Sequence, residues 1–170
     1  MKIELGGGSR NRGDDWLNVD ICETADIKHN LDRLPYPFDD DSIDEVYSSH
    51  CFEHLKSPIR AMNEVARICK IGATVEILVP HFGSEMCFIQ GHTGAFSMQM
   101  IRNVCVHFVD ESWTGKKKFV LIGHNLQPSE GLEVAKRELP FLAGIDDQTI
   151  MKWIQGTCHE IRFIFKVVGK

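Results

Sequence analysis

The sequence predicts an α/β fold built on a mostly parallel sheet, and three observations support this prediction. A strand, a helix and a second strand follow one another through residues 43–79, which favours parallel strands joined by a right-handed crossover. The run Gly6-Gly7-Gly8 ends the first apolar strand in a flexible turn. With 170 residues, 43% of them hydrophobic, the chain can bury a substantial core. We therefore expect a single domain over residues 1–170.

The first eighty residues contain short strands, loops and one helix. The expected strands are Ile3–Leu5, Leu17–Ile21, Ala25–His29, Ile43–Ser48 and Ala73–Val79. The helix begins at Ser57-Pro58, because serine is a preferred cap and proline suits the first helical position. Apolar residues recur at helical spacing from Ile59 to Cys69, and Gly72 marks the expected end.

The second half of the chain is expected to supply further helices and the last strands of the sheet. We expect helices over Ser97–Val109, Ser129–Leu139 and Asp147–Ile154, and strands over Phe119–Gly123 and Glu160–Val168. In the last strand, apolar residues alternate from Ile161 to Val167, which is typical of a strand with one buried face.

The composition excludes several classes of protein. A net charge of −5 and a pI near 5.9 disfavour a nucleic-acid binder, and the one basic run, Lys116–Lys118, is expected to be a solvated turn that enters a strand. The six cysteines form no C-x-x-C pair and no zinc-like spacing with histidine, so we expect reduced thiols and no metal. Apolar runs stay below about 18 residues, so we expect no membrane span and a cytoplasmic location.

Polar groups follow three successive strands, at the edge where open parallel sheets bind ligands. They are the glycine loop, Asp20, and the run Tyr47-Ser48-Ser49-His50. The two oxygens of Asp20 suit the vicinal hydroxyls of a ribose. A dinucleotide site is disfavoured, because the loop lacks a third glycine at the required spacing and no amphipathic helix follows it.

The same residues resemble a known family, the class I S-adenosylmethionine-dependent methyltransferases, and within it the small type 11 group. The resemblance covers about residues 2–96. It is carried by Glu4-Leu-Gly-Gly-Gly8, Trp16-Leu-Asn-Val-Asp20, Asp26-Ile-Lys-His-Asn30-Leu31, Leu34-Pro-Tyr-Pro-Phe38, the long run Ser42–Leu55 and Ala66–Gly72. It implies a Rossmann-like sheet with helices on both faces and one antiparallel strand near the edge, which we expect to be Glu160–Val168. It also implies a cofactor half over about residues 1–80 and an acceptor half over about 81–170.

The resemblance assigns the cofactor, S-adenosylmethionine, to particular positions. Gly6, Gly7 and Gly8, flanked by Glu4 and Leu5, would lie against its methionine part, and Asp20 would bind the ribose. Ile21, Asn30 and Leu31 would contact the adenine, while Ser48, Ser49 and His50 would line the floor near the sulfonium. The segment Ser9–Trp16 is too short and polar for the usual first helix. We therefore expect a shortened helix, with Arg10 or Arg12 supplying the charge near the cofactor carboxylate.

Methyl transfer requires positioning and, for a hydroxyl acceptor, a base. His50 and His81 are the catalytic candidates, with His92 as a third base candidate in a flexible stretch. We expect a small-molecule acceptor such as a sugar, a nucleotide-sugar or a metabolite. The alternative is a non-catalytic regulator or partner subunit that binds S-adenosylmethionine or S-adenosylhomocysteine, and a homodimer through edge strands stays open.

Overall fold

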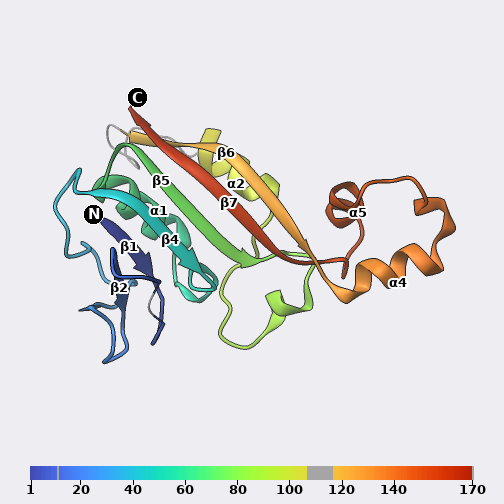
Figure 1. The fold of residues 1–170 in the computed structure, drawn as a ribbon, viewed down its shortest axis with the longest axis horizontal. Helices are drawn as coiled ribbons and strands as arrows, with labels where there is room; N and C mark the ends of the chain where they lie inside the picture. The colour runs from blue at the N-terminus through green and yellow to red at the C-terminus, as the bar shows by residue number, and fades with distance from the viewer. Residues whose placement is uncertain (11, 107–116, 170) are drawn as a thin grey trace.

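The computed structural model describes residues 1–10, 12–106 and 117–169, and the strands in these ranges form one seven-stranded sheet (Figure 1). The strands are β1 (Lys2–Leu5), β2 (Trp16–Asp20), β3 (Ile27–Lys28), β4 (Ile43–Ser49), β5 (Cys69–Pro80), β6 (Lys117–Pro128) and β7 (Cys158–Gly169). Their order is β3-β2-β1-β4-β5-β7-β6, and β7 runs antiparallel to both β5 and β6. The predicted mostly parallel sheet, with Glu160–Val168 as its antiparallel strand, is confirmed.

The helices follow the expected order with shifted ends. They are α1 (Pro58–Ile68), α2 (Met98–Val106), α4 (Glu130–Glu138) and α5 (Asp147–Trp153), with 3-10 turns η1 (Phe52–His54), η2 (Glu85–Phe88) and η3 (Pro140–Leu142). Figure 1 shows that α4 and α5, inserted between β6 and β7, extend beyond the end of the sheet. Of the helix expected over Ser97–Val109, residues 107–109 lie outside the described ranges.

Two details of the predicted helix at Ser57 are wrong. Ser57 occupies the cap position, but its side chain makes no capping hydrogen bond. The helix ends at Ile68 instead of near Gly72, because Cys69 pairs with Ile43 and begins β5. Helical spacing cannot reveal this early end, since the competing hydrogen bonds come from a strand about 26 residues away.

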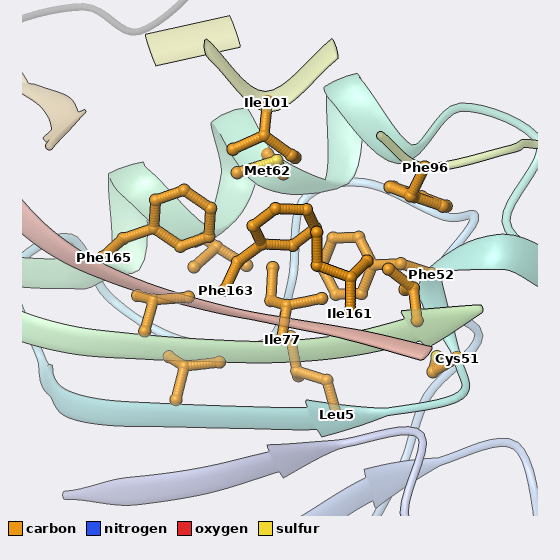
Figure 2. Close-up of a cluster of buried hydrophobic side chains, with 14 of the residues drawn as sticks. Leu5, Cys51, Phe52, Met62, Ile77, Phe96, Ile101, Ile161, Phe163 and Phe165 are labelled. Carbon is orange, nitrogen blue, oxygen red and sulfur yellow. The ribbon is translucent and has the colours of Figure 1, made fainter. Parts of the chain in front are cut away.

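The core lies between one face of the sheet and helices α1 and α2 (Figure 2). Ile77 on β5 and the rings of Phe163 and Phe165 on β7 point toward Met62 of α1 and Ile101 of α2. All five side chains are at most 3% exposed. Burying an aliphatic or aromatic side chain of this size contributes about 1.5 to 3 kcal/mol, so this contact fixes both helices on the sheet.

The opposite face of β5 and β7 is covered by none of the helices in the described ranges (Figure 1). It carries four polar, partly exposed side chains: Arg162 pairs with Glu76 at 3.2 Å, and Lys166 Nζ donates to Thr74 Oγ1 at 2.9 Å. The expectation of helices on both faces is therefore wrong for this part of the sheet. The segments after β1 and β2, which would supply such helices, are short turns here.

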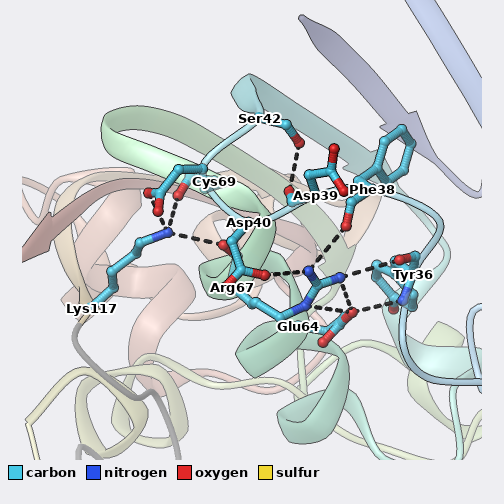
Figure 3. Close-up of polar contacts among 10 residues, drawn as sticks. Tyr36, Phe38, Asp39, Asp40, Ser42, Glu64, Arg67, Cys69 and Lys117 are labelled. Carbon is cyan, nitrogen blue, oxygen red and sulfur yellow. Dashed lines mark hydrogen bonds and ion pairs between the residues drawn. The ribbon is translucent and has the colours of Figure 1, made fainter.

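A polar network ties the loop before β4 to α1 (Figure 3). Glu64 Oε1 accepts hydrogen bonds from the Tyr36 backbone N–H at 2.6 Å and from Arg67 Nη2 at 2.5 Å. Arg67 also bonds the Phe38 carbonyl and Asp40. Glu64 and Arg67 therefore hold the loop before β4, a central strand of the sheet, against α1.

The expectation of a solvated side chain in the basic run is wrong for Lys117, the first residue of β6. Its side chain is only 12% exposed and Nζ donates to the carbonyls of Arg67 and Cys69, at 2.9 and 2.6 Å, beside Asp41 (Figure 3). It neutralises the C-terminal carbonyls of α1, where a cation is favoured. Lys116 lies outside the described residues.

Candidate cofactor and active site

A cleft of about 300 Å³ opens at the carboxyl ends of β1, β2, β3 and β4. Its lining contains Gly6, Asp20, Ile21, Asn30, Leu31 and His50 from the predicted set, together with His29, Asp32, Cys51, His54 and Leu55. The four strands are parallel, so their carboxyl ends gather these groups at one edge. The order of strand-end residues in the sequence thus predicted the position of the cleft and about half of its wall.

Two features require glycine at position 6: a left-handed backbone conformation and the close approach of Cys51. Its φ is 75°, and a Cβ at this position would come closer than 3.0 Å to both Cβ and Sγ of Cys51. Cys51 follows β4, and no sequence motif marked it as part of the site. Burial raises the pKa of its thiol to about 12, so it acts as a small apolar wall rather than a nucleophile.

The glycine loop is shaped by the side chain of Asn18, which no sequence motif indicated. Asn18 Oδ1 accepts from Gly7 N at 3.1 Å, and its Nδ2 donates to the Gly8 carbonyl at 2.7 Å. Asn18 lies on β2, next to the loop, because β2 pairs with β1 in register. These two bonds satisfy one backbone donor and one backbone acceptor of the glycine loop.

Asp20 lies at the end of β2 with its carboxylate held by backbone amides. Oδ2 accepts from Gly8 N and Oδ1 from Cys22 N, both at 2.9 Å. Each carboxylate oxygen has a second lone pair, so the side chain can still accept from two hydroxyls. Asp20 therefore links the glycine loop to the position expected for a ribose.

Several predicted cofactor residues do not line the cleft. Leu5 is fully buried in the core, and Ser48 is also buried, with its hydroxyl donating to the Leu5 carbonyl at 2.9 Å. Glu4 and Ser49 are buried as well, while Gly7 and Gly8 form the turn behind Gly6. Because side chains alternate along a strand, residues such as Leu5 and Ser48 face the core rather than the open edge.

The two arginines proposed for the cofactor carboxylate lie outside the cleft wall. Arg10 Nε donates to the Gly7 carbonyl at 3.2 Å. Arg12 stacks over the ring of Tyr47, 3.3 Å from its centroid, and also over Trp16. Arg12 therefore covers part of the sheet face, whereas Arg10 remains beside the glycine loop.

His50 lies between two carboxylates at the end of β4. Its Nδ1 is 3.2 Å from Glu53 Oε1 and its Nε2 is 2.8 Å from Glu160 Oε2. Its φ is 53°, a left-handed conformation that strains a residue with a Cβ. Glu160 was missed because it is 110 positions away in the sequence and reaches His50 only through β7.

The second catalytic candidate, His81, lies in a different cavity. This cavity, of about 380 Å³, is also lined by Phe82, Arg102, His124, Lys152 and Trp153. His81 Nδ1 accepts from Gly83 N at 3.3 Å, and burial lowers the pKa of the ring. The structure thus separates the two histidines: His50 lines the strand-end cleft, and His81 lines a pocket beside α2 and α5.

The contacts of His50 and His81 predict opposite titration behaviour. The hydrogen bond to Glu53, reinforced by Glu160, raises the pKa of His50 above its usual value near 6.5, while burial lowers that of His81. Histidine NMR titration should find His50 protonated at a higher pH than His81. In Glu160→Gln the His50 pKa should fall. If His50 titrates below His81, or Glu160→Gln leaves it unchanged, the charge network is not formed in solution.

The raised pKa of His50 also fixes how this residue contributes to the free energy of unfolding as pH changes. A raised pKa in the folded state favours folding fully below the unfolded pKa near 6.5, and the effect is lost as pH rises through the folded pKa. The stability difference between the wild type and Glu160→Gln should therefore shrink from pH 6 to alkaline pH.

Comparison with known proteins identifies the fold. Residues 11–77 match the family described as methyltransferase domain. The methyltransferase in a complex with the Haloferax volcanii Trm112 methyltransferase activator has a TM-score of 0.60 at 20% identity, over 97% of this chain and 81% of its own. An S-adenosylmethionine-dependent methyltransferase from Mesorhizobium loti has a TM-score of 0.59 at 13% identity, over 97% and 89%. This chain has the class I methyltransferase fold.

A further similar structure was solved with a bound nucleoside product. A phosphoethanolamine N-methyltransferase from Haemonchus contortus, solved with S-adenosylhomocysteine, has a TM-score of 0.58 at 15% identity, over 99% of this chain and 49% of its own. No curated protein matches the chain. Within the described ranges, no helix has the length and apolar character needed to cross a membrane.

Proposed function

We propose that this chain binds S-adenosylmethionine in the strand-end cleft and transfers its methyl group to a small-molecule acceptor. The observation that carries the proposal is the pairing of Gly6 and Asp20 in the wall of one cleft. The loop at Gly6 gives the backbone close access, and Asp20 offers a carboxylate suited to a vicinal diol. Asn30 and Leu31 lie in the same wall, where the adenine would be held.

In this proposal, the residues of the chain bind, orient and deprotonate the reactants. The bound cofactor supplies the methyl group and leaves as S-adenosylhomocysteine. Glu53 orients His50 through Nδ1, and Glu160 occupies Nε2. The two carboxylates favour the protonated ring, so His50 can accept a proton from the acceptor only after Nε2 has lost its own proton to Glu160 or to solvent and Glu160 has moved away from it. Glu160 therefore acts as a positioning residue that controls when the base is free.

The second cavity supports an acceptor with a negatively charged group. Arg102 and Lys152 lie in its wall with the aromatic side chains of Phe82 and Trp153, and no carboxylate residue is among the described residues that line it. Such a lining favours a phosphate or carboxylate beside an apolar body. The Haemonchus contortus relative, solved with phosphomonomethylethanolamine, offers a parallel for a phosphate-bearing acceptor.

We also propose a cytoplasmic location, which the six free thiols support.

Calorimetric titration of S-adenosylmethionine and S-adenosylhomocysteine tests the cofactor site. Asp20→Ala should weaken binding by about 1 to 3 kcal/mol, because a charged hydrogen-bond partner is lost. Asp39→Ala is the matched control, since Asp39 is an exposed aspartate outside the cleft wall and should leave binding unchanged. A folded wild-type protein that binds neither nucleoside would contradict the proposal.

A second candidate function is a non-catalytic binding subunit. One observation favours it: the described part of residues 6–15 forms turns without a helix, so the glycine loop lacks the helix N-terminus that would face the cofactor carboxylate. Release of S-adenosylhomocysteine in a screen of anionic acceptors distinguishes the two functions. Saturable binding without release from any acceptor would favour the subunit.

A further inference from the structure

A cluster of one carboxylate and two imidazoles lies next to the cofactor cleft. Glu53, His54 and His92 each offer one ligand atom, and these atoms lie within 4.8 Å of one another. Glu53 and His54 belong to η1, directly after β4, whereas His92 comes from the loop before α2. No spacing rule predicts this group, because His92 is separated from its partners by nearly forty residues.

Two buried polar atoms in this cluster have no hydrogen-bond partner among the described residues. Glu53 is 1% exposed, and its Oε2 is unpaired, as is Nδ1 of His92. An unpaired buried carboxylate oxygen carries a large desolvation cost unless a cation or donor reaches it. The other oxygen, Oε1, is held by His50 at 3.2 Å, so the orientation of the carboxylate is fixed. A cation held by Oε2 of Glu53 and Nδ1 of His92 would give each of these atoms a partner.

The surroundings hold the three ligands close together. Thr93 N donates to the Glu53 carbonyl at 2.7 Å, and Thr93 Oγ1 donates to the Leu55 carbonyl at 2.5 Å. Phe52, the first residue of η1, is inserted into the core (Figure 2). The loop that carries His92 is therefore bonded to a firmly packed turn, which keeps the three ligand residues close together.

The histidine contacts fit metal binding. His54 Nδ1 lies 3.3 Å from the Gly91 carbonyl, which can only accept, so Nδ1 carries the proton and the other nitrogen keeps its lone pair. Metal-bound histidines commonly donate their second nitrogen to a carbonyl in this way. Ligands of one zinc ion at 2.0–2.2 Å lie roughly 3.4 Å apart, so the ligand atoms have to move closer by at most about 1.4 Å.

We propose that Glu53, His54 and His92 bind a divalent transition-metal ion such as Zn²⁺. Two imidazoles and one carboxylate are ligands that zinc and its neighbours in the first transition series accept, and they leave a fourth position for water. The ion would join the 91–93 loop to η1, which follows His50 in the chain. Its binding does not depend on the cofactor, so it is tested without S-adenosylmethionine.

Cobalt substitution provides the test. The full chain, stripped of metal with a chelator, is titrated with Co²⁺ and followed by visible absorption, then with Zn²⁺ by calorimetry. The wild type should bind one ion per chain. His54→Ala and His92→Ala should each weaken binding at least about 10-fold. His159→Ala, an exposed histidine outside the cluster, is the matched control and should bind like the wild type.

Each outcome decides the proposal. Failure of the wild type to bind either ion at micromolar concentration would overturn it. Binding that both ligand variants retain would also overturn it, because the ion would then lie elsewhere. Circular dichroism checks folding of each variant without metal. His54 is exposed, so His54→Ala decides the result if His92→Ala does not fold.

Discussion

Gly6→Ala is expected to lower the free energy of unfolding by about 2 to 5 kcal/mol and to abolish cofactor binding. The added Cβ would collide with Cβ and Sγ of Cys51, and overpacking of this kind costs about 1 to 3 kcal/mol. The left-handed φ of 75° adds about 1 to 2 kcal/mol for any residue with a Cβ. Urea unfolding and titration with S-adenosylmethionine measure the two effects.

Gly8→Ala is the matched control for this prediction. Gly8 also has a positive φ, of 62°, but a Cβ there would meet no heavy atom within 4 Å. Only the conformational cost of about 1 to 2 kcal/mol is therefore expected. If both variants lose the same stability, the contact between Gly6 and Cys51 is not what requires glycine.

Glu64→Ala is expected to lower the free energy of unfolding by about 2 to 4 kcal/mol. The substitution leaves the buried N–H of Tyr36 without an acceptor and removes the main ionic partner of Arg67. An unsatisfied buried donor costs about 1 to 3 kcal/mol, and breaking a partly buried ion pair adds to this loss. Chemical denaturation monitored by tryptophan fluorescence gives the value.

Glu64→Gln separates the two contributions. Its carbonyl oxygen can still accept from the Tyr36 N–H, while the charge facing Arg67 is lost. We expect less than half of the loss seen for Glu64→Ala, since Arg67 keeps Asp40 and the Phe38 carbonyl. Equal losses in the two variants would assign the effect to charge alone.

Local patterns in the sequence predicted the parts of the fold that depend on local contacts. The strand–helix–strand unit from β4 to β5 could be predicted because the helical periodicity and the proline at the helix start agree. The position of Asp20 in the cleft wall could be predicted because this residue ends the strand next to the glycine loop. The end of α1 was not, because pairing between Ile43 and Cys69 overrides helical spacing.

The candidate site shows the same division. Gly6 and His50 follow strands, so their place at the carboxyl edge follows from topology alone. Glu160 and His92 reach the site through contacts across long stretches of chain, and no spacing rule connects them to His50 or Glu53. The role of Asn18 could not be predicted for another reason: it depends on side-chain hydrogen bonds to the backbone of the neighbouring loop, and composition and spacing do not show such bonds.

The uncovered face of β5 and β7 changes how their sequences should be read. A central strand in a three-layer α/β protein is apolar on both sides and appears as an unbroken hydrophobic run. Here Thr74 and Glu76 on β5 and Arg162 and Lys166 on β7 interrupt the apolar residues, and they pair across the strands on the solvent side. The polar residues in these strands therefore indicate, from the sequence, a two-layer architecture in which helices cover only one face of the sheet. In other chains of this fold, the same alternation in the central strands would reveal the loss of a helical layer from the order of the residues alone.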